Sequence, residues 1–322
     1  MPPLVAIVGP TAVGKTSLSI RLAEALGGEI VSADSRQVYR GMNVGTAKAT
    51  PQEQARMPHH LLDILDPDQP LSLAEFQEMA YGAVDAILAR GRVPFLVGGT
   101  GQYVMAVVEG WKIPRVPPDE DLRRDLYCQA EEEGAEALHA RLARLDPDAA
   151  ERIDARNVRR IVRALEVCLL TGRPISEQQG KAPPPYRILI VGLSLPRPRL
   201  YDRIDERVED MMTAGLEQEV RNLLAAGYGF HLPAMSGVGY GQFAPYLAGE
   251  ASLDDVVADI KRATRRFVRH QANWFRHDDA RIHWFEAADD PYPAVLAAVR
   301  DLLASPAVTD PRAAAPCPSP PM

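Results

Sequence analysis

The chain has 322 residues, of which 46% are hydrophobic and 25% are charged, and its net charge is −7. This composition is typical of a globular protein with one large domain or two, and it excludes collagen-like, disulfide-rich and wholly disordered chains. The acidic balance excludes nucleic-acid binding through overall charge but is compatible with a local basic groove.

No apolar run reaches the length of a transmembrane helix, and the N-terminus lacks the charged region of a signal peptide. The cysteines, Cys128, Cys168 and Cys317, are widely spaced and form no metal or disulfide pattern. We therefore expect a cytoplasmic protein that does not associate with membranes.

The first predicted strand, 4–8, runs into Gly9-Pro10-Thr11-Ala12-Val13-Gly14-Lys15-Thr16. This segment matches the phosphate-loop pattern G-x-x-x-x-G-K-[ST], and a helical pattern follows it. Backbone N–H groups at the start of a helix bind phosphate oxygens. We expect Lys15 to reach the terminal phosphates and the Thr16 hydroxyl to ligate Mg²⁺. The alternative is an ordinary glycine turn between a strand and a helix.

Further strands are predicted at 29–33, 93–97 and 187–193, with a helix at 74–90. Alternating strands and helices indicate an α/β fold with a parallel sheet flanked by helices, as in P-loop NTPases. Thr11, Asp34 and Thr100 each follow a strand end, so we expect them at one edge of the sheet. Asp34 is either a general base or Mg²⁺-associated group, or else a helix N-cap.

Between these strands the character of the chain changes. Residues 119–145 and 148–170 are predicted to form charged amphipathic helices without intervening strands. We therefore expect a discontinuous catalytic core, 1–114 and 186–304, with a helical insertion domain at 115–185. A Pro- and Ala-rich tail, 305–322, is predicted to be disordered.

Two groups of arginines are spaced to form basic stripes on helices. The first consists of Arg152, Arg156, Arg159 and Arg163, and the second of Arg262, Arg265, Arg269 and Arg276. For the second helix we expect an apolar face formed by Ile260, Ala263, Phe267 and Trp274. The local excess of positive charge favours a phosphate-backbone partner, and the alternative is a set of surface ion pairs.

Three other features are less specific. His59-His60 has no third metal ligand at a suitable spacing and is interpreted as a turn or core pair. Gly98-Gly99-Thr100-Gly101 permits close backbone approach to a ligand. Tyr240 lies in a glycine-rich loop and either stacks on a base or packs at the surface.

Taken together, the motifs resemble the bacterial tRNA dimethylallyltransferases, the IPP transferase family. The matching segments occur in family order: 9–16, 34–42, 45–48, 59–63, 97–101, 163–167, 264–265 and 274–276. The resemblance implies transfer of a dimethylallyl group from dimethylallyl diphosphate to N6 of adenosine 37 in tRNA. It also implies a P-loop core with a helical insertion that grips the anticodon stem-loop.

The resemblance assigns roles residue by residue. The implied catalytic residues are Asp34, Thr11, Lys15 and Thr100. The implied diphosphate-binding residues are Gly9, Thr11, Ala12, Val13, Gly14, Lys15, Thr16 and Arg221. The implied tRNA-binding residues are Asp34, Ser35, Arg36, Gln37, Thr100, Arg123, Val158, Arg159, Arg160, Ile161, Val162 and Arg163. Mg²⁺ is the implied cofactor, and we expect a monomer.

The chain departs from the family pattern at Gln102, at Gly241 and at Arg269-His270, where leucine, a basic residue and Lys-Arg are usual. Three alternative functions stay open: an adenylate isopentenyltransferase acting on free AMP, a P-loop small-molecule kinase and a non-catalytic RNA-binding module. The arginine stripes and the helical insertion favour tRNA over free AMP or a kinase substrate. The intact phosphate loop and Asp34 argue against a module without activity.

Overall fold

The computed structural model describes residues 1–305. Its contacts divide them into two compact units, one formed by 1–108 with 185–305 and the other by 109–184. The two units are described separately. Within the described residues, no helix is both long and apolar enough to cross a membrane. The predicted tail lies outside the described residues except for Ser305.

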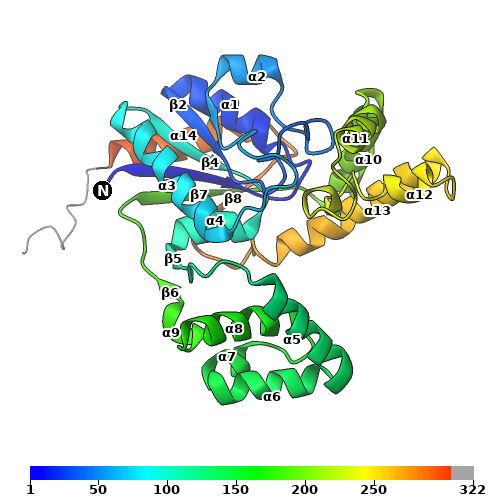
Figure 1. Ribbon diagram of the computed structural model, residues 1–322. Helices are drawn as coiled ribbons and strands as arrows, with labels where there is room; N and C mark the ends of the chain where they lie inside the picture. The colour runs from blue at the N-terminus through cyan, green and yellow to red at the C-terminus, as the bar shows by residue number, and fades with distance from the viewer. Residues whose placement is uncertain (306–322) are drawn as a thin grey trace, which may run out of the picture. The chain divides into compact units, whose positions relative to one another are not determined.

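The larger unit is built on a parallel sheet, which has six strands among residues 1–305 (Figure 1). The strand order is β3-β2-β4-β1-β7-β8, and every neighbouring pair is parallel. The strands are β1 (Pro3–Val8), β2 (Gly28–Ser32), β3 (His59–His60), β4 (Val93–Val97), β7 (Arg187–Ser194) and β8 (Ile282–Glu286). The α/β class predicted from the alternation of strands and helices is therefore confirmed.

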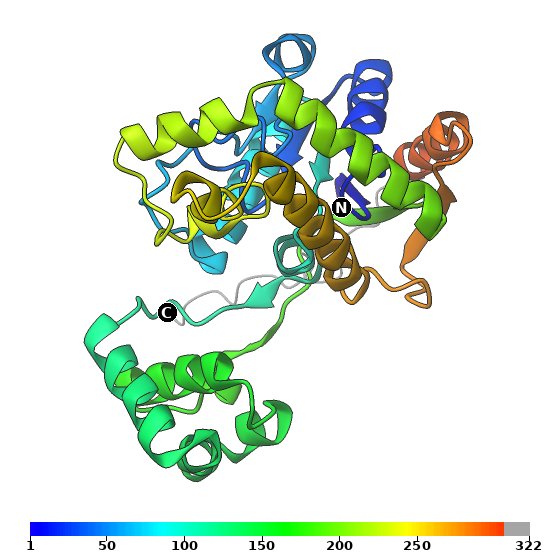
Figure 2. The same cartoon turned by 90° about the vertical axis from the view of Figure 1, so that its right-hand side faces the viewer.

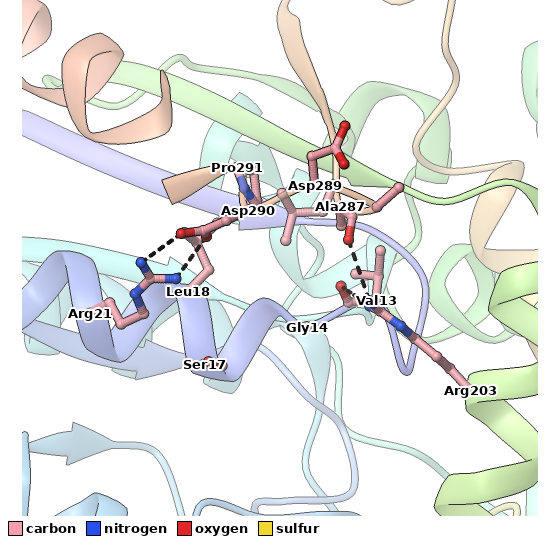
Figure 3. A pocket seen from close by; sticks show the side chains of 12 residues that line it. Val13, Gly14, Ser17, Leu18, Arg21, Arg203, Ala287, Asp289, Asp290 and Pro291 are labelled. Atoms are coloured by element: carbon pink, nitrogen blue, oxygen red, sulfur yellow. Dashed lines mark hydrogen bonds and ion pairs between the residues drawn. The ribbon is translucent and has the colours of Figure 1, made fainter. Parts of the chain in front are cut away.

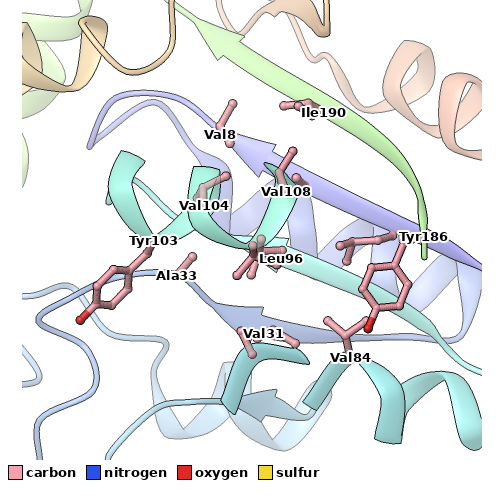
Figure 4. Packing of buried hydrophobic residues seen from close by; sticks show 14 of the residues in the cluster. Val8, Val31, Ala33, Val84, Leu96, Tyr103, Val104, Val108, Tyr186 and Ile190 are labelled. Carbon is pink, nitrogen blue, oxygen red and sulfur yellow. The ribbon is translucent and has the colours of Figure 1, made fainter. Parts of the chain in front are cut away.

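Helices cover both faces of this sheet. Side chains alternate along β1, so that Leu4, Ala6 and Val8 pack on one face while Val5 and Ile7 pack on the other. The first face is covered by α3 (Leu73–Ala89) and α4 (Gly101–Glu109), whose apolar side chains appear in Figure 4. The second is covered by α1 (Lys15–Leu26) and α14 (Tyr292–Ala304). Burial on both sides explains the nearly continuous apolar runs of the central strands.

A separate apolar cluster joins helices of the C-terminal half to the segment that follows β2. Within it, α10 (Arg197–Thr213) and α13 (Leu253–Ala272) pack against one another (Figure 2). Tyr240 is fully buried in this cluster, so both of its predicted positions, on a base or at the surface, are wrong. The helical elements here are α10 (Arg197–Thr213), α11 (Leu216–Ala225), the 3₁₀ turn Ala234–Ser236, α12 (Phe243–Leu247) and α13 (Leu253–Ala272), with α2 (Pro51–Arg56) near β3 in sequence.

The smaller unit has its own apolar core and a two-stranded antiparallel ladder. Its elements are β5 (Trp111–Lys112), α5 (Glu120–Glu133), α6 (Ala135–Leu145), α7 (Pro147–Arg152), α8 (Val158–Thr171), α9 (Ile175–Gln178) and β6 (Gly180–Lys181). Both long helices predicted here are interrupted. Gly134, at φ 90°, separates α5 from α6. A turn follows α7, and the Asn157 side chain caps α8 by accepting a hydrogen bond from the Arg160 N–H.

Candidate functional site

The phosphate loop, residues 9–16, connects β1 to the start of α1. Gly9 and Gly14 have φ of 141° and 103°, values that favour glycine. At Gly9 a Cβ would also lie 2.5 Å from the Leu193 carbonyl oxygen. The first turn of α1 contains no acidic side chain, so its N-terminal N–H groups face no competing carboxylate from that turn.

The loop opens onto a cavity of about 970 Å³, here called the main cavity. Its walls come from the loop itself, the ends of β2 and β4, the segment 43–51 and α10. Apolar lining, including Ile30, Val44 and Met211, lies beside charged groups. The charged side chains among its lining residues are Lys15, Asp34, Lys48, Glu53, Asp63, Arg203, Glu206, Arg207 and Asp210. A cavity of this volume suits a small ligand with one charged and one apolar end.

Lys15 is folded back onto its own loop. Its Nζ donates hydrogen bonds to the carbonyl oxygens of Gly9 at 3.0 Å and Pro10 at 2.7 Å. The pKa of Lys15 is lowered from 10.5 to about 7, mainly by burial and also by the charge of Arg207, while the Asp34 carboxylate opposes the shift. A bound polyanion would favour the charged form of this amine.

Arg207 is a cavity residue that the sequence reasoning missed. It lies one turn after Arg203 on α10, and both line the main cavity. Burial lowers the pKa of Arg207, opposed by the carboxylate of Asp34, and Arg207 makes no hydrogen bond or ion pair within residues 1–305. Its i, i+4 spacing with Arg203 was visible in the sequence, but only the fold places the pair beside the phosphate loop.

Arg221, the predicted diphosphate ligand, lies elsewhere. It is on α11, pairs with Glu217 at 2.7 Å and lies over the ring of Tyr246. It is not among the residues that line the main cavity. The pairing of Arg221 with Glu217, four residues earlier on the same helix, is typical of an exposed helix surface. The geometry therefore gives no support to Arg221 as a diphosphate ligand, whereas Arg207 does line the cavity.

A second, smaller cavity of about 350 Å³ lies on the other flank of the phosphate loop (Figure 3). Arg21 closes one side through hydrogen bonds of 2.7 and 2.9 Å to Asp290. Arg203 lines both cavities and donates to the carbonyl oxygens of Val13 and Ala287, each at 3.4 Å. Arg203 therefore braces the loop against the segment that follows β8.

Asp34 closes a turn, and the helix that an N-cap requires does not follow it, so the N-cap prediction is wrong. Its Oδ1 accepts the backbone N–H of Arg36 at 2.8 Å and of Gln37 at 3.4 Å, which is the geometry of an Asx turn. The residue also lines the main cavity, and its carboxylate acts electrostatically on Lys15 and Arg207. The hydrogen bonds that fix Oδ1 therefore hold the carboxylate at the cavity wall.

The residues around Asp34 stabilise that segment. The Thr100 hydroxyl accepts the Ser35 N–H at 3.0 Å. Arg36 donates to the carbonyl oxygens of Pro233 and Ala234. Gln37 donates to the carbonyl oxygens of Thr46 and Ala47 at 3.2 and 3.3 Å. Each side chain that was predicted to contact tRNA here therefore also has an internal partner.

Comparison with known proteins identifies the family to which the chain belongs. An IPP transferase family model matches residues 37–278, and an isopentenyl transferase model matches residues 2–63. A tRNA dimethylallyltransferase of Roseiflexus sp. is 59% identical over 276 residues, covering 86% of this chain and 90% of that protein. One from Herpetosiphon aurantiacus is 52% identical over 305 residues, covering 95% and 96%. The chain belongs to the tRNA dimethylallyltransferase family.

Solved structures agree with this family. The tRNA isopentenylpyrophosphate transferase of Bacillus halodurans is 41% identical, with a TM-score of 0.69 and coverage of 94% of this chain and 96% of that one. A eukaryotic dimethylallyltransferase acting on tRNA is 26% identical, with a TM-score of 0.78 and coverage of 94% and 78%. The family resemblance found in the motifs is therefore confirmed.

In the smaller unit, several residues that the family resemblance assigns to tRNA belong to its core. Ile161 and Val162 are buried against the other helices of this unit, so their side chains cannot contact RNA. Arg123 and Arg163 both pair with Glu166, whose side chain is fully buried, at 2.8 and 2.5 Å. The stripe predicted on one helix is also divided by the turn between α7 and α8.

Two arginines of this unit keep the exposure that RNA binding requires. Arg159 and Arg160 are exposed in the first turn of α8 and have no acidic partner within the described chain. Val158, beside them, is half-buried. The RNA-facing part of the predicted segment is therefore its first turn.

The second predicted stripe is partly used by ion pairs. Arg265 pairs with Asp205 at 2.5 Å, and Arg262 pairs with Asp259. Arg276 lies beyond the end of α13 and pairs with Asp278. The buried residues of α13 are Val256, Ile260, Val268 and Gln271. The predicted apolar face is therefore right for Ile260 but wrong for Phe267 and Trp274, which are 40% and 37% exposed. Arg266 and Arg269 are exposed without an acidic partner among residues 1–305.

His59 and His60 form the short edge strand β3 rather than a turn. His60 contacts Glu29 at 2.7 Å, and the His59 ring contacts the Met57 carbonyl oxygen. Residues 1–305 contain no group of three or more His, Cys, Asp or Glu side chains suited to hold a metal ion. Mg²⁺ often uses few protein oxygens and completes its shell with phosphate and water. The Thr16 hydroxyl at the main cavity fits that kind of site.

Proposed function

We propose that this chain transfers the dimethylallyl group of dimethylallyl diphosphate to N6 of adenosine 37 in tRNA, giving N6-(dimethylallyl)adenosine and diphosphate. The main support is one cavity that brings together the phosphate loop, the guanidinium groups of Arg203 and Arg207, and the Asp34 carboxylate. A P-loop suits a prenyl diphosphate as well as a nucleotide, because both present the same phosphate oxygens.

The diphosphate end is proposed to bind at residues 9–16 and Arg207. As the C–O bond to the prenyl carbon breaks, negative charge grows on the leaving diphosphate. Lys15 and Arg207 both line the cavity, and we assign them to stabilise that charge, so that they favour the transition state over the bound substrate. Mg²⁺, held by Thr16 and the phosphate oxygens, would supply additional charge neutralisation.

The adenine end requires a proton acceptor. The N6 amine forms a bond to the prenyl carbon and must lose one proton, which we assign to the Asp34 carboxylate. Thr100 positions the Asp34 segment through Ser35, and Thr11 lines the cavity beside Lys15. The target base must leave the anticodon stack to reach the Asp34 carboxylate in the main cavity.

We propose that the tRNA anticodon stem-loop contacts the first turn of α8 in the helical insertion and the exposed arginines of α13. The supporting observation is the unpaired, exposed state of Arg159, Arg160, Arg266 and Arg269 within the described residues. A phosphate backbone satisfies such guanidinium groups. The protein would act as a cytoplasmic monomer, with the discontinuous core 1–114 and 186–304 performing the reaction.

The test is incubation with dimethylallyl diphosphate and Mg²⁺, together with unmodified tRNA, free AMP or neither. Nucleosides are then analysed by mass spectrometry. We expect a dimethylallyl adduct on tRNA adenosine only. Modified AMP with unmodified tRNA would support the adenylate reaction, and no adduct on either would contradict prenyl transfer.

A further inference from the structure

Gln271, near the end of α13, is a buried polar side chain that links two loops of the N-terminal part of the chain. Its Oε1 accepts the backbone N–H of Thr11 at 2.9 Å, and its Nε2 donates to the carbonyl oxygen of Gly99 at 2.9 Å. The residue is only 4% exposed. Both ends of the amide are satisfied, and reversing it would place oxygen against oxygen and N–H against N–H.

The glycines after β4 leave space for this contact. A Cβ on Gly99 would lie 2.3 Å from Gln271 Nε2, and a Cβ on Gly101 would lie 2.2 Å from Trp274 Cγ. In the direction of these two Cβ atoms the space is therefore filled by Gln271 and Trp274, while the Gly99 backbone also lines the main cavity. The Gly99 position is also close to the functional groups, since its Cβ would lie 3.6 Å from Lys15 Nζ.

We propose that Gln271 is a positioning residue that fixes the start of the phosphate loop for diphosphate binding. The inference rests on the proposed role of residues 9–16 as the diphosphate site. The hydrogen bond commits the Thr11 N–H to the protein, so the ligand is bound by donors further along the loop. It also ties Thr11 to the turn that lies beside Lys15.

The two hydrogen bonds of Gln271 have a consequence beyond stability, because both of their backbone partners line the main cavity. Thr11 follows the end of β1, and Gly99 follows the end of β4. Losing the amide leaves a half-buried donor and a buried acceptor without their partner, and the loop would move to find water. A displacement of about 1 Å at a catalytic site can cost roughly 10²-fold in rate. A residue that only adds stability would not change diphosphate kinetics selectively.

The experiment compares Gln271→Met and Gln271→Glu with the wild-type full chain. Methionine keeps the volume and removes both hydrogen bonds, whereas glutamate keeps an acceptor for Thr11 but, when ionised, opposes the Gly99 carbonyl oxygen. We expect kcat/KM for dimethylallyl diphosphate to fall about 10- to 100-fold in both variants, with the Kd for tRNA within about twofold of wild type.

The matched control is Gln77→Met. Gln77 also donates to a backbone carbonyl oxygen, that of Ala106, at 2.7 Å, but it does not line the main cavity. This control is expected to lower the melting temperature without changing kcat/KM. The proposal would be overturned if Gln271→Met lowered the melting temperature as much as Gln77→Met does but left kcat/KM unchanged. A selective loss of tRNA affinity in Gln271→Met would also overturn it.

A second variant covers the case in which Gln271→Met does not fold. Gly99→Ala retains Gln271 but pushes its amide away, and we expect the same selective loss. Binding of inorganic diphosphate to Lys15→Ala tests the phosphate loop as the diphosphate site independently of the role of Gln271. If that variant binds as well as wild type, the assignment of the phosphate loop fails. If only the Gln271 and Gly99 variants behave as wild type, the positioning role fails.

Discussion

The hydroxyl of the fully buried Tyr240 donates a 2.7 Å hydrogen bond to Oε1 of Glu219. The same carboxylate accepts the backbone N–H groups of Asn43, Val44 and Gly45 at 2.8, 2.8 and 3.1 Å. Burial and the adjacent carboxylate raise the pKa of Tyr240 well above its usual range. Glu219 therefore holds the segment 43–51, which forms one wall of the cavity.

Glu219→Ala should lower both stability and activity, because three backbone donors lose their acceptor. We expect a loss of roughly 3 kcal/mol in the free energy of unfolding and a reduced kcat/KM. Tyr240→Phe should cost about 1 kcal/mol, since only one hydrogen bond is removed. Tyr246→Phe is the control: its hydroxyl bonds to Glu217 and the residue does not line the cavity. Chemical denaturation and prenyl-transfer assays measure the effects, and normal activity in Glu219→Ala would refute a role in shaping the wall.

Lys15→Ala should abolish turnover while tRNA binding persists. Removing one fixed group that stabilises developing charge costs on the order of 10²-fold or more. Turnover is measured at saturating substrates, and tRNA affinity by filter binding. Near-normal turnover would contradict the assignment of Lys15 to the leaving diphosphate.

Asp34→Asn should slow the chemical step without weakening either substrate. Asparagine keeps an oxygen that can accept from Arg36 and Gln37 but is a poor proton acceptor. The loss should be about 10²- to 10⁴-fold if Asp34 is the general base. A single-turnover experiment isolates this step, and an unchanged rate would leave Asp34 with its role in the turn alone.

The lowered pKa of Lys15, about 7 against 10.5, predicts a pH-dependent stability of the ligand-free protein. Between these values the unfolded chain binds a proton that the folded chain lacks, so the free energy of unfolding rises with pH across this window. The slope from this one group is at most about 1.4 kcal/mol per pH unit. Denaturation curves at pH 7 and 9 should show a larger rise for wild type than for Lys15→Met. Equal rises in the two proteins would mean that the pKa of the Lys15 amine is not lowered in the native state.

tRNA binding should weaken steeply with salt. When arginines neutralise RNA phosphates, counterions are released from the RNA, and this release is less favourable at high salt concentration. Replacing Arg159 and Arg160 together by alanine should weaken binding and make the salt dependence shallower, leaving the affinity for dimethylallyl diphosphate unchanged. The control is Arg124→Ala, an exposed arginine of the same unit that pairs with Asp121. If the double variant behaves like the control, the first turn of α8 is a solvated surface.

Features carried by contiguous residues were predictable from the sequence. The phosphate loop and the apolar runs of β1, β2, β4 and β7 fix their own local structure, and their edge of the sheet follows from parallel topology. The strands β3 and β8 were missed because one is two residues long and the other, Ile282–Glu286, is only partly buried. Neither has the apolar run of a central strand.

Features that depend on distant partners were not predictable. Gln271 and Thr11 are separated by 260 positions, and no local pattern marks either as the partner of the other. The exposure of an arginine is equally invisible to spacing: Arg163 is held by buried Glu166, while Arg159 is not. Arg207 was hidden for the same reason, because its helix reaches the phosphate loop only through the fold.

The position of β1 between β4 and β7 also matters for synthesis on the ribosome. The first strand to be made pairs along its whole length, Pro3–Val8, with a strand that begins only at Arg187. At roughly 5–20 residues per second, one side of β1 stays without its partner for on the order of ten seconds after β4 has been made. During that interval the nascent chain presents an apolar, unpaired strand edge, so we expect slower translation to prolong the period in which the early chain can aggregate.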